Sequence, residues 1–259
     1  MIRTETRDHV AVVTIANPPV NALPVAGWFE LADAITAAGR DPEVRCVILA
    51  AEGRGFQCGV DIKELAADPT KESLVAVNRG CAEAFAAVYE CEVPVIAAVH
   101  GYCLGGGIAL AGNADIVVAS DDATFGVPEV DRGALGTATH LARFVPQHKV
   151  RLLFFTGRTI TAAELLAHGT VEAVVPREQL LDAAWEIARE ITTKSPIVIR
   201  RAKESLNAIE PMLGDVRRAY RYEQGFTFEL NLWGESDELR QAFVDKREAQ
   251  VGDRARPGA

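Results

Sequence analysis

The sequence contains no apolar run that approaches the ~20 residues of a membrane-spanning helix, so we expect no membrane contact. It also lacks an excess of basic residues. There are 27 Lys and Arg residues against 36 Asp and Glu residues, which gives a formal net charge of −9. Because an acidic surface repels polyanions, a nucleic-acid-binding role is disfavoured. An anionic small ligand would need a local basic patch that overrides this field.

Cysteine is sparse and shows no functional pattern. The five cysteines are odd in number and form neither a CxxC pair nor a Cys/His metal spacing, so we predict no metal site. Residues 1–10 are charged and lack the apolar segment of a signal peptide. Together these features favour a cytoplasmic protein with reduced thiols.

No linker, charge block or internal repeat divides the 259 residues. The chain also lacks a G-x-G-x-x-G sequence opening a first βαβ unit and a phosphate-binding P-loop, which disfavours nucleotide-binding folds. With 49% hydrophobic residues it can form one substantial core. We expect a single core domain over residues 1–195, followed by a helical region over residues 196–259.

What the sequence does contain is an alternation of short apolar runs and helical patterns. Strands are predicted at residues 10–16, 44–50, 95–99 and 116–119, and helices at residues 25–38, 72–89 and 108–112. Past residue 175 the pattern is helical only, with an aromatic stripe at 219, 222, 226, 230 and 233 that either packs on the core or forms a subunit interface. The alternation predicts an α/β layered fold.

Two glycine-rich loops each stand between a predicted strand and a helix. Gly105, Gly106 and Gly107 open a helix, where free N–H groups and the positive end of the helix dipole can hold a developing oxyanion. Cys58 and Gly59 occupy a similar place after the strand at 44–50. Each such donor typically lowers a barrier by about 3 kcal/mol. On these residues alone, ordinary tight turns are the simpler interpretation.

Glu129 and Asp131 lie in a turn-rich segment flanked by glycines and a proline. If this segment is extended, the two side chains point to the same side, and one carboxylate raises the pKa of the other. Such a pair could act as acid and base, although a solvated loop is the commoner outcome for single carboxylates. Residues 65–74, which are polar and contain a proline, are predicted to form a mobile lid.

Four motifs in this order and spacing resemble the signatures of the crotonase (enoyl-CoA hydratase/isomerase) family. They are residues 17–22 (NPPVNA), 55–64 (GFQCGVDIKE), 101–107 (GYCLGGG) and 125–129 (FGVPE). The resemblance implies an α/β spiral of ββα repeats with a C-terminal helical trimerisation region that completes the CoA site. It also implies an acyl-CoA thioester substrate, no separate cofactor, and assembly as a homotrimer or a dimer of trimers.

The resemblance further implies roles for particular residues. The N–H groups of Cys58 and Gly106 would form the oxyanion hole, and Glu129 matches one of the two glutamates that hydratases use. The position of the second glutamate is occupied by Ala109, which disfavours ordinary hydration. The remaining expected substrate-binding residues are Asp61, Ile62, Lys63, Gly105, Gly107 and His140.

A closer resemblance is carried by residues 78–81, 88–91, 132–136, 139–141 and 223–232. These strings are similar to a subgroup from actinobacterial steroid breakdown that opens a ring of a bicyclic indane-dione carboxyl-CoA by hydrolysis. That chemistry would need Glu129 as the base, with Asp131 as its partner, and no glutamate at Ala109. The alternatives are an enoyl-CoA hydratase or isomerase and a non-catalytic acyl-CoA-binding protein.

Overall fold

Fully apolar strands form the centre of the fold in this computed structural model, which describes residues 1–68, 70–233, 235–247 and 249–250 and omits the side chains of Arg132, Val216 and Glu235. All five residues of β4 (Val95–Val99) are buried. β4 pairs in parallel with β3 (Cys46–Ala51) on one side and with β6 (Ile116–Ser120) on the other. Strands buried on both faces read as continuous hydrophobic runs, which is why the sequence revealed them.

The six-stranded sheet has the order β1-β2-β3-β4-β6-β9, and a smaller sheet has the order β5-β7-β8. The other strands are β1 (Ile2–Arg7), β2 (Val10–Ile15), β5 (Tyr102–Leu104), β7 (Thr124–Gly126), β8 (Thr159–Thr161) and β9 (Ala173–Val175). β1, which the sequence analysis missed, is an antiparallel edge strand whose residues are mostly exposed. Its charged side chains hide the strand pattern and protect the edge from further pairing.

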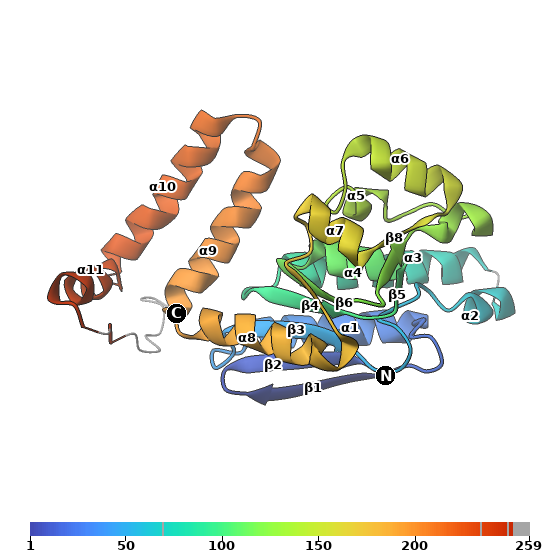
Figure 1. The fold of residues 1–259 in the computed structure, drawn as a ribbon, viewed down its shortest axis with the longest axis horizontal. Helices are drawn as coiled ribbons and strands as arrows, with labels where there is room; N and C mark the ends of the chain where they lie inside the picture. The colour runs from blue at the N-terminus through green and yellow to red at the C-terminus, as the bar shows by residue number, and fades with distance from the viewer. Residues whose placement is uncertain (69, 234, 248, 251–259) are drawn as a thin grey trace.

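Helices cover both faces of the large sheet, and the C-terminal helices stand beside it (Figure 1). They are α1 (Val25–Arg40), α2 (Ile62–Ala67), α3 (Lys71–Tyr89), α4 (Gly106–Asn113), α5 (Ala138–Leu141), α6 (Gln147–Thr156), α7 (Ala162–His168), α8 (Leu180–Thr192), α9 (Pro196–Ile209), α10 (Val216–Leu232) and α11 (Glu235–Asp245), with 3₁₀ helices η1 (Pro128–Arg132), η2 (Arg177–Gln179) and η3 (Glu210–Met212). The predicted α/β layering and the helices around residues 25–38 and 72–89 are confirmed.

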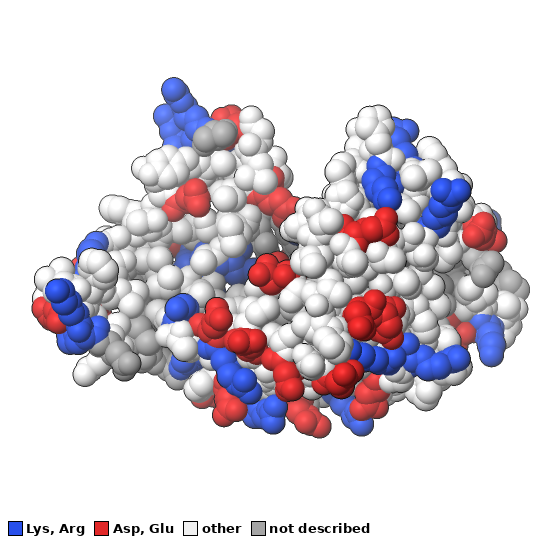
Figure 2. Space-filling model, viewed as in Figure 1, with Lys and Arg blue, Asp and Glu red and all other residues white. Residues whose placement is uncertain are grey.

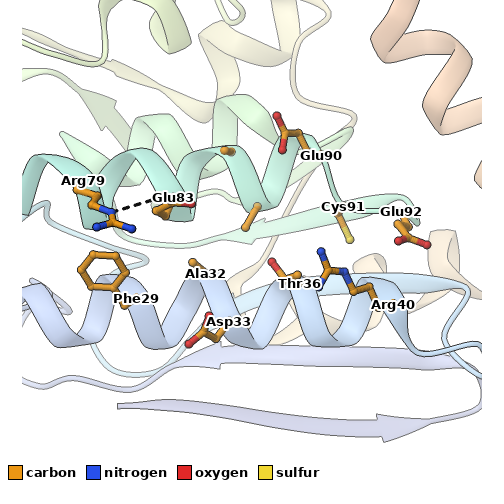
Figure 3. A pocket seen from close by; sticks show the side chains of 12 residues that line it. Phe29, Ala32, Asp33, Thr36, Arg40, Arg79, Glu83, Glu90, Cys91 and Glu92 are labelled. Atoms are coloured by element: carbon orange, nitrogen blue, oxygen red, sulfur yellow. Dashed lines mark ion pairs between the residues drawn. The ribbon is translucent and has the colours of Figure 1, made fainter.

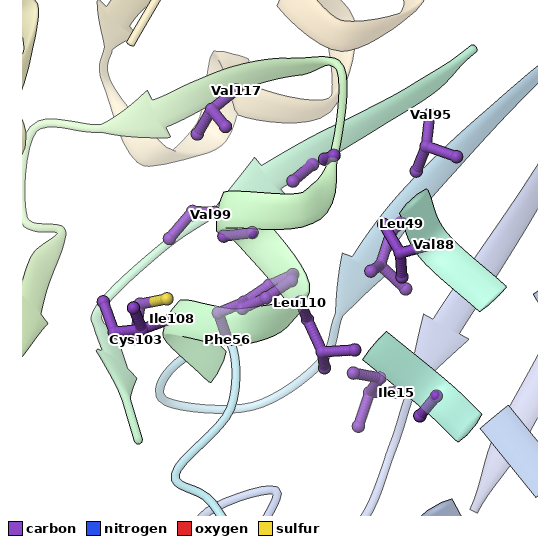
Figure 4. Close-up of a cluster of buried hydrophobic side chains, with 14 of the residues drawn as sticks. Ile15, Leu49, Phe56, Val88, Val95, Val99, Cys103, Ile108, Leu110 and Val117 are labelled. Carbon is purple, nitrogen blue, oxygen red and sulfur yellow. The ribbon is translucent and has the colours of Figure 1, made fainter. Parts of the chain in front are cut away.

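Alternate residues of the central strands enter two separate cores. Leu49 and Val95 belong to the larger core, which includes residues of α1, α3 and α4. Ile48 and Ile96 face the other way and pack with Trp185 of α8. Figure 4 shows part of the larger core, with Phe56 from the loop after β3 among its members. Because successive side chains of a strand point to opposite faces, these apolar strands can pack against helices on both faces of the sheet.

The topology brings the two glycine-rich loops to one edge of the sheet. β3 and β4 are parallel neighbours, so the segments that leave their carboxyl ends start side by side. The first segment contains Gln57 and Gly59, and the second runs through β5 into α4. A single bridge between Gln57 and Cys103 joins the segments directly. This edge is where the predicted site residues gather.

Helices α9 and α10 form a hairpin that stands apart from the sheets, and a deep notch separates it from the core (Figures 1 and 2). An ion pair between the buried Lys203 of α9 and the partly exposed Asp115 links the hairpin to the core. The division at residues 195 and 196 coincides with the start of α9 but stays a prediction, and residues 251–259 lie outside the described part. Within the described residues, no helix is both long and apolar enough to cross a membrane.

Candidate active site

The two glycine-rich loops meet at the start of α4. A Cβ atom placed on Gly59 would lie 3.7 Å from the backbone nitrogen of Gly106, so the loops approach backbone to backbone. The side chain of Gln57 holds the first loop in shape. Its Nε2 donates to the carbonyl of Gly59 at 2.7 Å, while its Oε1 accepts from the Gly59 N–H at 2.8 Å. The second loop is joined to it by the Leu104 N–H, which donates to the Gln57 carbonyl at 2.9 Å.

The backbone conformation at Gly105 and the packing at Gly106 favour glycine. Gly105 precedes α4 with φ 55° and ψ −117°, a conformation that side-chain-bearing residues rarely adopt. A Cβ on Gly106 would approach Cη2 of Trp28 to 2.6 Å. A Cβ on Gly107 would approach the Gln57 carbonyl to the same distance, so Gly107 is buried against the first loop and holds the loops together. The first-turn N–H groups of α4 therefore emerge beside the loop that contains Cys58.

Glu129 lies against the second loop, beside Gly105. Its Oε1 would be 3.1 Å from a Cβ on Gly105 and accepts a hydrogen bond from the Thr137 hydroxyl at 2.9 Å. Its Oε2 is buried and makes no hydrogen bond with any residue that the structure describes. Burial raises the pKa of the Glu129 carboxyl above the ordinary 4.5, and the hydrogen bond from Thr137 opposes this rise. The site thus presents an unsolvated carboxylate oxygen beside the start of a helix.

Asp131 does not join Glu129, and the expectation of an extended segment is wrong. Pro128–Arg132 forms the 3₁₀ helix η1, started by Pro128 and ended by Gly133 in the left-handed region. In a 3₁₀ helix, residues two apart point in different directions. The Asp131 carboxylate is exposed and lies against Gly157 after α6, where Oδ2 would be 2.8 Å from a Cβ. Burial, and not a neighbouring carboxylate, raises the Glu129 pKa.

His140 on α5 is half-buried and hydrogen-bonded within the protein. Its Nδ1 lies 2.9 Å from Oδ1 of Asn113, the last residue of α4. Its ring packs edge-on against Phe85 at 5.3 Å, and Phe85 packs in turn against Trp28 at 5.5 Å. Burial lowers the pKa of His140, so the neutral ring is favoured. These contacts link His140 to the residue that covers Gly106, and its predicted contact with substrate stays a prediction.

In the segment after the first loop, residues 61–64, two acidic side chains cap helices. Asp61 caps α2, since its Oδ1 accepts from the Lys63 N–H at 2.9 Å. Glu64 Oε2 accepts from the Val25 N–H at 2.8 Å and so caps α1. Ile62 is 56% exposed, and Lys63 is exposed as well. Both side chains are accessible to a ligand, and their contact with substrate stays a prediction. The expected lid contains the end of α2 and the start of α3, with Pro69 outside the described residues, and its mobility stays a prediction.

Sequence reasoning missed three polar side chains that build the site. Gln57 stood in the motif of residues 55–64, but nothing in the spacing showed that its side chain holds Gly59. Thr137 lies outside the quoted motifs, and its side chain holds Glu129. The third is Asn21, which is 2% exposed and whose Nδ2 donates to the carbonyls of Glu52 and Gly55 at 2.7 and 2.9 Å. Its place in the motif of residues 17–22 was the available signal, because a buried amide must satisfy its hydrogen bonds.

A separate groove lies between α1 and α3 (Figure 3). Its volume is about 470 Å³, and an ion pair between Arg79 and Glu83 crosses its wall. Its lining comes from α1, α3 and the residues after α3, not from the glycine loops or η1. Among the described residues, no group of three or more His, Cys, Asp or Glu side chains is arranged to hold a metal ion.

The fold and the paired glycine loops define a class of enzyme. The sequence model of the enoyl-CoA hydratase/isomerase family matches residues 5–254, so the chain belongs to this family. The predicted crotonase fold is confirmed by the crystal structure of the enoyl-CoA hydratase from Mycobacterium smegmatis, which is 27% identical. The two structures superpose with a TM-score of 0.90, and the match covers 96% of this chain and 98% of the M. smegmatis chain.

Two much more similar relatives carry the same name, (7aS)-7a-methyl-1,5-dioxo-2,3,5,6,7,7a-hexahydro-1H-indene-carboxyl-CoA hydrolase. The one from Rhodococcus jostii is 60% identical over 242 residues, covering 93% of both chains. The one from Mycobacterium tuberculosis is 59% identical over 243 residues, covering 94% of this chain and 98% of the relative. The resemblance to this hydrolase subgroup, first seen in short strings of the sequence, is thus confirmed.

Proposed function

We propose that this protein hydrolyses a ring carbon–carbon bond in a bicyclic indene-dione carboxyl-CoA thioester. The names of the two relatives at 60% and 59% identity support this substrate class. The observation that carries the proposal is the position of Glu129. Its carboxylate lies over Gly105 with one buried oxygen that has no partner among the described residues, immediately beside the expected oxyanion hole.

In the proposed reaction Glu129 acts as the general base. It removes a proton from water, and the resulting hydroxide attacks the ring ketone. The bond between this carbon and the α-carbon of the thioester then breaks, leaving a carboxylic acid on one side. The electron pair moves into the thioester as an enolate, whose oxygen is held by the N–H groups of Cys58 and Gly106. The proton on Glu129 finally transfers to the α-carbon, which completes the addition of one water.

One carboxylate is sufficient for this sequence of steps. Hydration of an enoyl thioester in the standard enzymes of the family divides its proton transfers between two glutamates, and the second position here is Ala109, which is fully buried in α4. The raised pKa of Glu129 suits a base that must also return its proton. Asp131, which points away toward Gly157, is proposed to support η1 and not to share the proton.

The CoA moiety and the assembly follow the family. We propose that the exposed Lys63 contacts a CoA phosphate, with Asp61 and Ile62 at the channel wall. We also propose a homotrimer or a dimer of trimers built through the C-terminal helices. Exposed aromatic residues on α10 support this, among them Tyr222 and Phe228, which are 50% and 65% exposed. A cytoplasmic location is proposed from the cysteine usage.

The test compares two substrates by mass spectrometry. The purified protein is offered the bicyclic carboxyl-CoA and crotonyl-CoA in parallel, each with Glu129→Gln as the matched variant. We expect a gain of one water on the bicyclic thioester, little on crotonyl-CoA, and loss of both in Glu129→Gln. Efficient hydration of crotonyl-CoA alone would instead make the protein an enoyl-CoA hydratase. No turnover on either, with binding intact, would indicate an acyl-CoA-binding protein.

A further inference from the structure

Thr137 stands in a backbone conformation that its side chain disfavours. Its φ of 57° and ψ of −4° fall in the left-handed region, which is uncommon for any residue with a Cβ and least suited to a β-branched one. The Ala138 N–H donates to the Gly136 carbonyl at 2.7 Å, so Thr137 is the centre of a tight three-residue turn. Strained positions of this kind persist only where the surrounding structure fixes them, and they cluster at functional sites.

The Thr137 side chain also lacks the capping hydrogen bond that a threonine at a helix N-cap normally makes. It precedes α5 at the N-cap, where a threonine hydroxyl usually accepts from an N–H of the first turn. Here it makes no such bond, and its Oγ1 donates to Oε1 of Glu129 at 2.9 Å. Two local preferences are therefore broken at one residue, whose hydroxyl binds the carboxylate over the glycine loops instead.

The hydrogen bond makes the two oxygens of Glu129 inequivalent. Oε1 is fixed by Thr137 and lies against Gly105, whereas Oε2 is buried without a partner among the described residues. We propose that Thr137 is the positioning residue of the base: its hydroxyl anchors Oε1, so that Oε2 is the atom that takes the proton from water. This inference rests on the proposed role of Glu129.

The hydrogen bond from Thr137 also affects the pH range over which Glu129 is ionised and can act as a base. The hydroxyl donates to the ionised form, so it opposes the effect of burial on the carboxyl pKa. Gly105 lies against the carboxylate, and the groups that donate to it are the Thr137 hydroxyl and the backbone N–H of Glu129 itself, none of which carries a charge. Loss of the hydroxyl therefore raises the pKa of Glu129, and the acid limb of the pH–rate profile moves to higher pH.

Four variants separate positioning from a structural role. Thr137→Val removes the hydroxyl and keeps the shape, and Thr137→Gly removes both the hydroxyl and the strain. Thr137→Ser keeps the hydroxyl, and Thr139→Val is the matched control at an exposed position of α5. We expect kcat on the bicyclic thioester to fall about tenfold in the Val and Gly variants, with KM little changed. The acid limb of the pH–rate profile moves to higher pH in these two variants. Thr137→Ser and Thr139→Val keep the kcat and the pH–rate profile of the parent.

The outcome for Thr137→Gly is decisive, because glycine adopts this conformation freely and folding is not at risk. A Gly variant with the parent's kcat and pH profile would overturn the inference and leave Thr137 a structural residue. Glu129→Gln is measured alongside to separate the two claims. If Glu129→Gln keeps its turnover, the proposed base is wrong. If only the Thr137 variants are unaffected, the base stands and the positioning role fails.

Discussion

Replacement of Gly105 by alanine perturbs the backbone and the base at once. The φ of 55° and ψ of −117° place a Cβ-bearing residue in a strained region, which costs about 1–3 kcal/mol of stability. The new methyl group would also lie 3.1 Å from Oε1 and 3.7 Å from Cδ of Glu129. The shorter distance is closer than ordinary van der Waals contact, so the carboxylate must move by a few tenths of an ångström.

The two effects are separated by a matched control. Gly169 also has a positive φ, 73°, but a Cβ there would meet nothing within 4 Å. Gly169→Ala therefore carries strain without contact with the site. For a chain of this size, about 1–3 kcal/mol lowers Tm by roughly 2–12 °C. We expect a loss in this range for both variants, larger for Gly105→Ala because its φ and ψ lie outside the left-handed region that Gly169 occupies. Only Gly105→Ala displaces the base, and we expect its kcat to fall by about 10- to 100-fold.

Thermal unfolding and turnover of the bicyclic thioester measure these two quantities on the same preparations. A Gly105→Ala variant that loses Tm as Gly169→Ala does, and yet retains kcat within about twofold, would refute this reasoning. The contact between Gly105 and the carboxylate would then have no bearing on the reaction.

Three charged side chains give further testable expectations. The pKa of Glu129 is raised in the folded protein, so its ionisation lowers the free energy of unfolding as pH rises from 4.5 through the folded pKa. In urea unfolding we expect Glu129→Gln to be more stable than the parent at pH 8 and equal to it at pH 4. Equal stability of the two proteins at both pH values would contradict this. Lys203→Met removes the buried cation that lies 2.7 Å from the partly exposed Asp115 and should cost about 1–3 kcal/mol, whereas Lys194→Met, at an exposed position, should cost little. Asp131→Asn should change kcat by less than about threefold, and a loss matching that of Glu129→Gln would restore Asp131 to the reaction.

Much of the fold could be predicted because the pattern that carries it is local. The buried runs of β3 and β4 and the strand–helix alternation are visible without any tertiary information. The short strands β5, β7 and β8, with three residues each, were not predicted, since so few residues show no period. The edge strand β1 has six residues but was missed because most of them are polar and exposed, so the strand shows no apolar run.

The site was predicted only as far as its motifs reach. Gly105, Gly106 and Glu129 could be placed together from a family resemblance, and the structure brings Glu129 against the glycine loops. The pairing of Glu129 with Asp131 failed because Pro128 starts a 3₁₀ turn, and the direction of a side chain depends on that local geometry. Thr137 was missed for a related reason. A hydrogen bond between residues eight apart depends on how the intervening loop turns back, which no periodicity encodes.

The most direct test of the central claim is the fate of solvent oxygen. The bicyclic carboxyl-CoA is converted in ¹⁸O-labelled water, and the product is analysed by mass spectrometry for the parent protein and Glu129→Gln. We expect one ¹⁸O in the new carboxyl group of the ring-opened product, an intact CoA thioester, and no product from Glu129→Gln. Release of free CoA, or water added across a double bond with the ring intact, would contradict the proposed ring hydrolysis.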